Sequence, residues 1–301
     1  MNAPFRHKIE YTVFYAVKTI LNLFPRKTAF LLASLLGNIL FVLDQKHREL
    51  AYSNLKTAFG DQLSPSRKKF ITKACFQHFC HVFLDFLQIS RLNSKQKDRL
   101  ISVQGTDILK RVLRQKKGAL IFTAHFGLWE IAAQILSKYA KLNVIARSLD
   151  NPLLEKELHR LRAEIGSHVI YKQNAARHVL KALNQNELVA VLIDQNVLRQ
   201  EGIFVEFFGK DASTTPSLAT FYLRTKAPII PIFCTPTTQK GYHLKIMEPL
   251  DIPSTGDFNK DVTNITQICT RIIERQIKQH PHYWLWFHDR WRSRPLSENA
   301  E

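Results

Sequence analysis

Short apolar runs alternate with amphipathic segments from residue 118 to residue 247, and this alternation constrains the fold more than any other feature of the sequence. Apolar runs of five to seven residues predict strands, and the segments between most of them have the apolar spacing of helices. Strands and helices in alternation predict an α/β protein, with a central sheet, mainly parallel or mixed, flanked by helices. The predicted strands are 118–124, 142–146, 188–193, 203–207, 229–234 and 242–247; the predicted helices are 128–139, 153–165, 175–184, 217–226 and 262–279.

Two apolar stretches, 11–24 and 28–43, open the chain and predict a helical N-terminal membrane anchor. A membrane-spanning helix needs about 20 apolar residues, and the second stretch falls slightly short of that length. Three alternatives stay open: a short span, a helical hairpin within one leaflet, and a hairpin buried in the core. Basic residues flank the stretches on both sides, so charge does not decide the orientation. We expect residues 1–45 to form the anchor and residues 46–301 the domain that contains the sheet.

The formal net charge of +18 calls for an acidic partner or surface. Nucleic acid, anionic phospholipid, a phosphorylated lipid and an acidic carrier protein would all satisfy it. A nucleic-acid-binding protein should carry a known binding motif and no membrane stretch, and this sequence meets neither condition. We therefore expect no nucleic-acid partner.

The sequence gives no indication of a metal or a cofactor. No glycine-rich phosphate loop follows a predicted strand, so no nucleotide cofactor is indicated. Cys75, His78, Cys80 and His81 lie close together, but on one helix they cannot all face a single ion. The four cysteines of the chain form no disulfide framework, which fits a reducing environment.

The segment TAHFGLWE, residues 123–130, contains the strongest candidate for catalysis. His125 follows a predicted strand at its carboxyl end, where open α/β sheets bind ligands. Glu130 lies about one turn into the next helix and can reach back to one imidazole nitrogen. The other nitrogen would then be a better base for a substrate hydroxyl. A structural histidine with no catalytic role remains the alternative at this point.

The His-x4-Glu spacing after an apolar strand resembles the His-x4-Asp/Glu motif of glycerolipid and lipid A acyltransferases. Five further segments resemble the lipid A late-acyltransferase branch, in the order expected for it, so the resemblance covers roughly residues 10–295. Two departures are Ser148, where many relatives have proline, and Pro216-Ser217, where glycine is common nearby. The five segments are 47–59, 146–155 (with Arg147, Asn151 and Pro152 matching), 192–196, 202–217 and 284–295.

The resemblance implies an enzyme of lipid A and lipopolysaccharide biosynthesis at the bacterial inner membrane, with its active site on the cytoplasmic face. It would move a fatty acyl chain from acyl carrier protein to a hydroxyl of a lipid A precursor of the Kdo-lipid IVA type, with no covalent intermediate. Its partners would be acyl carrier protein, the lipid A precursor and anionic phospholipid. Alternatives are another acceptor, such as a phosphatidylinositol mannoside or a lysolipid, with acyl-CoA as donor, and an inactive scaffold of the same fold.

The resemblance also suggests roles for individual residues. His125 would be the general base, oriented by Glu130, and backbone N–H groups of residues 127–129 would be candidates for anion binding. Asp194 and Gln195 end a predicted strand and should face the same site. The residues expected to bind substrate are Arg147, for a phosphate; Asp194, for Arg147 or a substrate hydroxyl; Gln195; Thr214, for the acceptor; and Arg290 and Arg292, for lipid phosphates.

Overall fold

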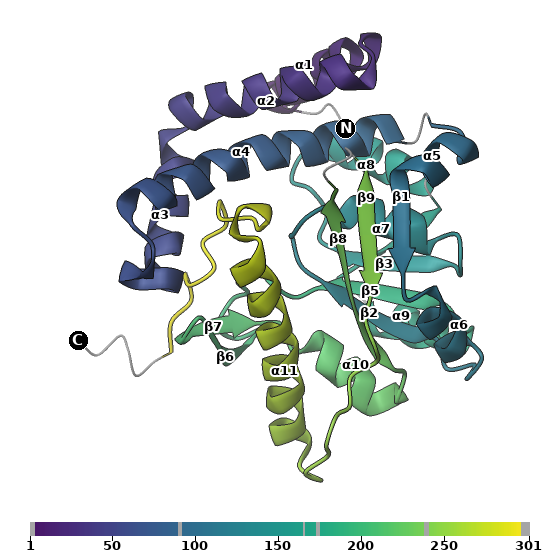
Figure 1. Ribbon diagram of the computed structural model, residues 1–301. Coiled ribbons are helices and arrows are strands. Elements are labelled where there is room, and N and C mark those ends of the chain that lie inside the picture. Colours follow the sequence, from purple (N-terminus) through teal and green to yellow (C-terminus); the bar gives the residue numbers. More distant parts are fainter. Residues whose placement is uncertain (1–3, 90–91, 165, 173–174, 238–240, 296–301) are drawn as a thin grey trace.

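A seven-stranded mixed sheet forms the centre of the protein (Figure 1). The computed structural model describes residues 4–89, 92–164, 166–172, 175–237 and 241–295. The strand order is β1-β9-β8-β2-β5-β3-β4, and every neighbouring pair is parallel except β8 with β9. The strands are β1 Ile101–Gln104, β2 Ala119–Thr123, β3 Leu142–Ala146, β4 Ser167–Tyr171, β5 Leu188–Leu192, β8 Ile229–Pro236 and β9 Tyr242–Ile246. The predicted α/β fold is thereby confirmed.

Helices cover both faces of this sheet. One hydrophobic core joins it to α3, α4, α9, α10 and α11, and a second core joins its other face to α4, α6 and α7. The helices are α1 Phe5–Leu23, α2 Arg26–Leu43, α3 Gln45–Phe59, α4 Pro65–Gln88, α5 Ser94–Leu100, α6 Thr106–Leu113, α7 Trp129–Leu136, α8 Pro152–Glu164, α9 Ala175–Asn184, α10 Ser217–Thr225 and α11 Phe258–Gln279, with 3-10 turns at Gly60–Gln62 and Pro281–Tyr283.

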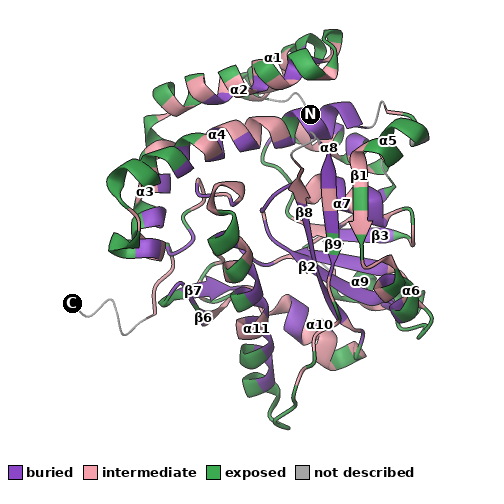
Figure 2. Ribbon diagram, viewed as in Figure 1, coloured by how far each residue is buried: buried purple, intermediate pink, exposed green. Residues whose placement is uncertain are grey.

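The central strands are apolar on both faces because both faces are covered. All five residues of β2 are buried, as are four of the five in β5 (Figure 2). Leu120 and Phe122 belong to one core, whereas Ile121 between them belongs to the other. A parallel strand covered on both faces has this continuous apolar composition, which made the central strands easy to predict.

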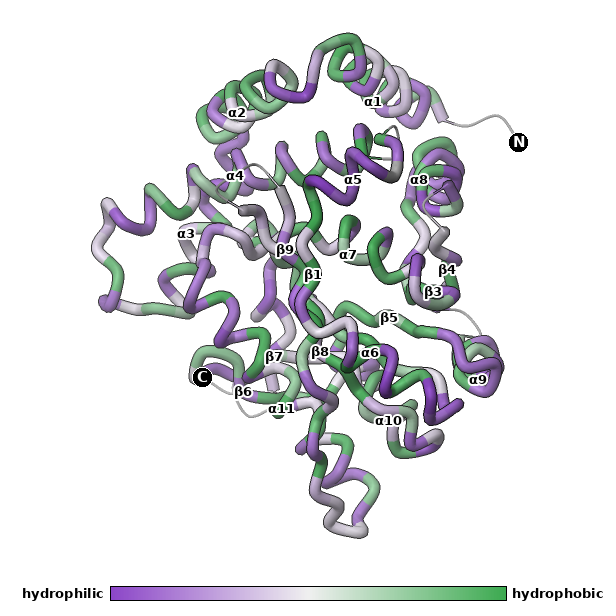
Figure 3. Tube along the Cα trace, turned by 45° about the vertical axis from the view of Figure 1, so that its right-hand side comes forward, coloured by the Kyte–Doolittle hydropathy of each residue, from purple (hydrophilic) through white to green (hydrophobic). Residues whose placement is uncertain are grey.

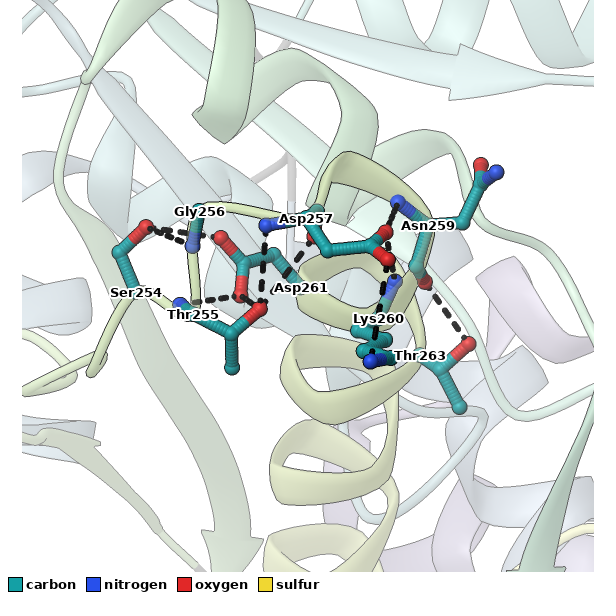
Figure 4. Close-up of polar contacts among 8 residues, drawn as sticks. All are labelled: Ser254, Thr255, Gly256, Asp257, Asn259, Lys260, Asp261 and Thr263. Atoms are coloured by element: carbon teal, nitrogen blue, oxygen red, sulfur yellow. Dashed lines mark hydrogen bonds and ion pairs between the residues drawn. The ribbon is translucent and has the colours of Figure 1, made fainter.

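Side-chain caps fix the starts of two long helices. Ser64 accepts a hydrogen bond from the Arg67 amide at 3.2 Å, and Pro65 occupies the first turn of α4. At the start of α11, Asp257 accepts from the amides of Asn259 and Lys260 at 2.9 and 3.1 Å, while Asp261 holds the loop before it through Thr255 (Figure 4). These contacts set where α11 begins on the sheet.

All six predicted strands are present, but one of them lies outside the central sheet. The strand β6 Ile203–Phe207 pairs with β7 Lys210–Thr214 in a separate antiparallel hairpin. The strands β1, β4 and β7 had not been predicted. They are only partly buried, so they lack the continuous apolar run by which β2 and β5 are recognised.

The N-terminal stretches form the two predicted helices, which lie along α4 at one edge of the molecule (Figure 1). Ala29, Ala33 and Gly37 of α2 are buried, and a third hydrophobic core joins α1, α2, α4 and α8. Among the described residues, α2 is the one helix that is long and apolar enough to cross a membrane by length and composition. The outer side of α2 is exposed, so the alternative of a fully buried hairpin does not fit.

Candidate active site

His125 and Asp194 meet because their strands are neighbours in register. The last residues of β2 and β5, Thr123 and Leu192, are paired in the parallel ladder. His125 and Asp194 each follow two residues later, so both emerge at the same edge of the sheet. His125 Nδ1 lies 2.9 Å from Asp194 Oδ1, and the His125 amide donates to Asp194 Oδ2, also at 2.9 Å. Both side chains thus lie at one edge of the sheet, in direct contact.

Asp194 is fully buried yet well supplied with hydrogen-bond donors. A third donor, the indole N–H of Trp284, lies 2.8 Å from Oδ2. Burial acts to raise the pKa of Asp194, but the charge on the facing His125 and the donated hydrogen bonds outweigh burial and hold the pKa below its ordinary value. The carboxylate is therefore ionised, and Nδ1 of His125 is assigned its proton from this contact.

The C-terminal segment 283–288 is hydrogen-bonded to the turn that carries His125. Trp284 forms an isolated antiparallel bridge with Phe126. On either side of this bridge, Leu285 donates to the His125 carbonyl at 3.1 Å, and the Gly127 amide donates to the Tyr283 carbonyl at 2.9 Å. This C-terminal segment thus fixes the backbone on both sides of the histidine.

Gly127 permits the turn after His125. The φ of Gly127 is +60°, and a Cβ there would collide with the Cys234 carbonyl oxygen. The amide of Leu128 donates to this same oxygen at 2.8 Å. Because the Gly127 and Leu128 amides both have backbone acceptors, the predicted anion-binding role is wrong for these two groups.

Glu130 does not orient His125 as predicted. Its carboxylate is ion-paired with Arg162 of α8, with 2.5 Å between Oε1 and Nη2, and both side chains are largely buried. Nδ1 of His125 is occupied by Asp194 instead. The reason is geometric: Glu130 is in the first turn of α7, which directs it toward α8, whereas Asp194 approaches from the adjacent strand end.

A cavity of about 720 Å³ opens beside His125. Its inner part is apolar and lies between α7 and the strands β2, β3 and β5. Its outer part contains polar and charged side chains from α7, α8 and the loops at the carboxyl edge of the sheet. The inner lining includes Ile121, Ala132, Leu136, Leu142, Val144 and Ala190; the outer lining includes His125, Glu130, Arg147, Arg162, Lys172 and Gln195.

The residues predicted to bind substrate fall into two groups. Arg147 and Gln195 line the cavity; Arg147 is exposed and ion-paired with Asp150 at 2.8 Å, not with Asp194. Arg290 and Thr214 are buried, so neither can contact a lipid at the surface. Arg290 instead donates to the Ser213 carbonyl at 2.5 Å and to the Thr214 hydroxyl, which ties it to β7. Arg292 is exposed and does not line the cavity.

The structure adds three residues to the site that had not been predicted. Trp284 reaches Asp194, Arg162 reaches Glu130, and His288 lines the cavity while its Nε2 accepts from the Asn196 amide at 2.8 Å. A buried tryptophan needs a hydrogen-bond partner for its indole N–H, so the sequence could have indicated that Trp284 has one, although not which. The partners of Arg162 and His288 lie far away in the sequence, and no residue spacing indicates them.

The geometry suits transfer of a proton between His125 and a molecule in the cavity. Asp194 holds Nδ1, which leaves the second ring nitrogen to take a proton from a bound group. Within the described ranges, no group of three or more His, Cys, Asp or Glu side chains is arranged to hold a metal ion. The apolar inner cavity suits a hydrocarbon chain, and the cations at its mouth suit an anion.

Comparisons with a family profile and with individual proteins point to the same family. The profile of the bacterial lipid A biosynthesis acyltransferases matches residues 2–293. The lipid A biosynthesis palmitoleoyltransferase of Escherichia coli (strain K12) is 24% identical over 258 residues, covering 85% of this chain and 82% of that protein. The lauroyltransferase of the same strain is 22% identical over 267 residues, covering 86% and 84%. A lipid A biosynthesis acyltransferase of Haemophilus influenzae is 26% identical over 198 residues, covering 64% and 61%.

These matches and the α/β fold identify the chain as an acyltransferase. More narrowly, the chain belongs to the bacterial lipid A biosynthesis acyltransferase family, because the family profile spans almost its entire length. The family resemblance inferred from the sequence is thereby confirmed.

Proposed function

We propose that this enzyme transfers a fatty acyl chain from acyl carrier protein to a hydroxyl of a lipid A precursor of the Kdo-lipid IVA type. The observation that carries the proposal is the His125–Asp194 pair beside a cavity with an apolar inner lining. The names of the relatives support the acceptor. The cavity supports a long hydrocarbon chain as the transferred group.

In the proposed reaction, His125 acts as general base toward the acceptor hydroxyl. It takes the hydroxyl proton as the oxygen attacks the thioester carbonyl, and it returns that proton to the departing thiol of the carrier when the carbon–sulfur bond breaks. Asp194 stays ionised and stabilises the imidazolium that forms between the two steps. The products are an ester on the acceptor and a free carrier thiol.

The acceptor oxygen is the only nucleophile this reaction requires. The four cysteines are poorly suited to form an acyl-enzyme, because burial raises the pKa of each thiol, to about 12 for Cys75 and to about 11 for Cys80. Thiols with such pKa values contain little thiolate near neutral pH. This supports direct transfer without a covalent intermediate.

Charged side chains at the cavity mouth would bind the phosphorylated acceptor or the phosphate of the carrier's prosthetic group. Arg147, Arg162 and Lys172 all line this part of the cavity. Glu130 contributes by holding Arg162 in place, and Gln195 offers hydrogen bonds to the sugar or the amide groups of a substrate. Arginine and lysine are the usual partners of phosphate in proteins.

The enzyme would work at the inner membrane, with its active site on the cytoplasmic side and residues 1–45 as its anchor. Its precursor lipid resides in a membrane, and the described part of this region includes α2, which is long and apolar enough to cross one. The charge of +18 would favour both anionic phospholipid and an acidic carrier protein.

The test is acyl transfer by the purified protein in detergent. Acyl carrier protein loaded with C12, C14 or C16 chains would be supplied with the sugar-bearing tetra-acylated precursor, and mass spectrometry would detect one added chain. We expect a product with the wild type and a loss of about 10²-fold or more in His125→Ala. Absence of product with every chain would refute the acceptor or donor, and acyl-CoA with another glycolipid would be tested next. Undiminished activity of His125→Ala would refute the mechanism.

A further inference from the structure

The helix α2 lies antiparallel along α4 over its whole length. Near its start, Arg26 is ion-paired with Asp85 at 2.9 Å. Further along, the rings of Phe30 and His81 are 4.9 Å apart. Near its end, Asn38 accepts a hydrogen bond from Gln77 at 3.0 Å, and Phe41 packs edge-on against Phe76. Residue numbers rise along α2 as they fall along α4, so both ends of α2 rest on the same helix.

The contact between these helices is tight as well as continuous. A Cβ on Gly37 would lie 2.6 Å from Gln77 Cα, so the two backbones touch there. The hydroxyl of Ser34 lies 2.8 Å from His81 Nε2. Asp85, buried at 2% exposure, also accepts a hydrogen bond from Tyr242 of β9 at 2.5 Å. The start of α2 is thus connected through Asp85 to the central sheet.

The helix α4 cannot leave the protein body to follow α2 through a bilayer. Its opposite side is part of the sheet's hydrophobic cores, through Ile71, Cys75 and Val82. His78 of α4 is buried and lies 3.1 Å from the Gly127 carbonyl in the turn after His125. A helix in contact with the active-site turn is fixed to the catalytic domain, and α2 is fixed to that helix.

The side of α2 that faces away from α4 is apolar and exposed. Leu31, Leu35, Ile39 and Val42 recur at helical spacing along it, with exposed fractions of 44–70%. The neighbouring helix α1 has an exposed stripe of its own. Figures 2 and 3 show α1 and α2 at one edge of the molecule, with exposed and hydrophobic residues recurring along both. The α1 stripe consists of Phe5, Ile9, Val13, Ile20 and Leu23.

We propose that α1 and α2 lie flat in one leaflet of an anionic membrane, and that α2 does not cross it. We call the two exposed stripes together the α1–α2 face. Basic residues stand at its borders, with Arg6 and Lys8 in α1, Lys27 at the start of α2 and Lys46 just past its end, all exposed. Helices with an apolar face and a basic border bind at the headgroup boundary of anionic bilayers. The proposal rests on the proposed membrane association and specifies its geometry.

This arrangement also connects the membrane face with the cavity. Lys18 of α1 is ion-paired with Glu157 of α8 at 2.5 Å, and Asn151 donates to the His7 carbonyl at 2.9 Å. The same helix, α8, supplies Leu158 and Arg162 to the cavity wall. A leaflet that holds α1 would therefore lie next to one wall of the cavity, where an acceptor lipid could enter without leaving the membrane surface.

Cysteine labelling from one side of the membrane tests the proposed orientation. Lys27→Cys, Lys46→Cys and, as a marker on the catalytic domain, Lys210→Cys would each be introduced into a full-length chain carrying Cys80→Ala. Inside-out and right-side-out membrane vesicles would be treated with an impermeant maleimide, and detergent-solubilised protein would show that all three sites react. We expect all three to react from the same side. Labelling of Lys27→Cys only from the side opposite to Lys46→Cys would show that α2 spans and would overturn the proposal.

A second experiment identifies what covers the α1–α2 face. Leu31→Ser, Leu35→Ser and Ile39→Ser would be combined and compared with a substitution of Phe258, Phe258→Ser, because Phe258 is an exposed apolar residue at the start of α11. We expect the triple variant to bind phosphatidylglycerol-containing vesicles at least 10-fold less, with Phe258→Ser unchanged and both variants folded by circular dichroism. Unchanged binding by the triple variant would contradict the proposal. So would a wild-type dimer that the triple variant dissociates, since a second copy of the chain would then be the partner. Vesicle binding is measured without substrate, so its outcome is separate from that of the acyl-transfer assay.

Discussion

Asp194 Oδ1 lies 2.9 Å from His125 Nδ1 although the two residues are 69 positions apart in the sequence. The contact exists because β2 and β5 are adjacent, parallel and in register. It separates the roles of two carboxylates at one site: Asp194 contacts the imidazole, whereas Glu130 contacts Arg162. A carboxylate on Nδ1 both fixes the ring and stabilises its protonated form, so the two carboxylates should differ in their effects on the reaction.

Asp194→Asn should reduce kcat more than Glu130→Gln does. The amide can donate a hydrogen bond to Nδ1, which would favour the wrong tautomer of His125, and it cannot stabilise the imidazolium. We expect a loss in kcat of about 10²–10⁴-fold, the range attributable to general base catalysis. Glu130→Gln should act mainly on KM, because it releases Arg162 at the cavity mouth. Steady-state acyl transfer by both variants gives the comparison, and the reverse order of kcat effects would disprove this division of roles.

Trp284→Phe should lower kcat by roughly 10-fold with little change in KM, about the effect of losing one hydrogen bond to a charged group. The substitution removes the indole N–H that donates to Asp194 while keeping most of the aromatic packing. Trp291→Phe is the matched control, because within the described part of the chain its buried indole nitrogen has no hydrogen-bond partner. We expect this control to retain wild-type kcat. Equal losses in both variants would mean that packing, and not the N–H group, matters.

Ala132→Leu should shift the enzyme toward shorter acyl chains. Ala132 lies on α7 and lines the inner cavity, so a larger side chain there would occupy space needed by the end of a long chain. The ratio of rates with C16 and C10 donors should fall, whereas Leu136→Ala, deeper along α7, should raise it. Rates with donors from C10 to C16 provide the measurement. A uniform change across all chain lengths would argue against this cavity as the acyl site.

His78→Gln should make the protein less sensitive to acid. Burial lowers the pKa of His78 from 6.5 to about 3 in the folded state, so below pH 6.5 the unfolded chain takes up a proton that the folded chain does not. The contribution of neutral His78 to the free energy of unfolding is therefore complete above pH 6.5 and is lost as the pH falls toward 3. The loss reaches about 2 kcal/mol at pH 5. Glutamine can still donate to the Gly127 carbonyl and does not titrate.

Thermal unfolding in detergent at pH 7.5 and pH 5.0 measures this effect. The drop in Tm between the two values should be smaller in His78→Gln than in the wild type. The other histidines are common to both proteins, so the difference reports on His78 alone. An identical drop in both proteins would show that His78 is not the group that titrates.

Much of the fold was predictable because it depends on local patterns. The strands β2, β5 and β8 are buried on both faces and therefore have continuous apolar sequences that can be recognised without any partner. The edge strands β1 and β4 were missed because their residues are only partly buried. The cap at Ser64 was predictable for the same reason as the central strands, since a cap involves only neighbouring residues.

The site was predictable to the extent that strand ends define it. His125 and Asp194 could both be placed at the carboxyl edge, because each follows an apolar strand. Their contact with each other could not be predicted, since nothing in the sequence states that β2 and β5 are neighbours. Arg290 shows the opposite error: it was expected to bind lipid phosphates, but it is buried against Ser213 and Thr214.

The sequence by itself therefore determined the α/β class, the family and the position of His125 after its strand, since each depends on residues close together in the chain. The tertiary structure decided which carboxylate contacts that histidine, that Trp284 reaches the same carboxylate, and that α2 lies along α4. The physical reason is that hydrogen bonds and ion pairs require atoms within about 3–4 Å. Such distances between remote segments are fixed only when the sheet order and the packing of helices bring them together.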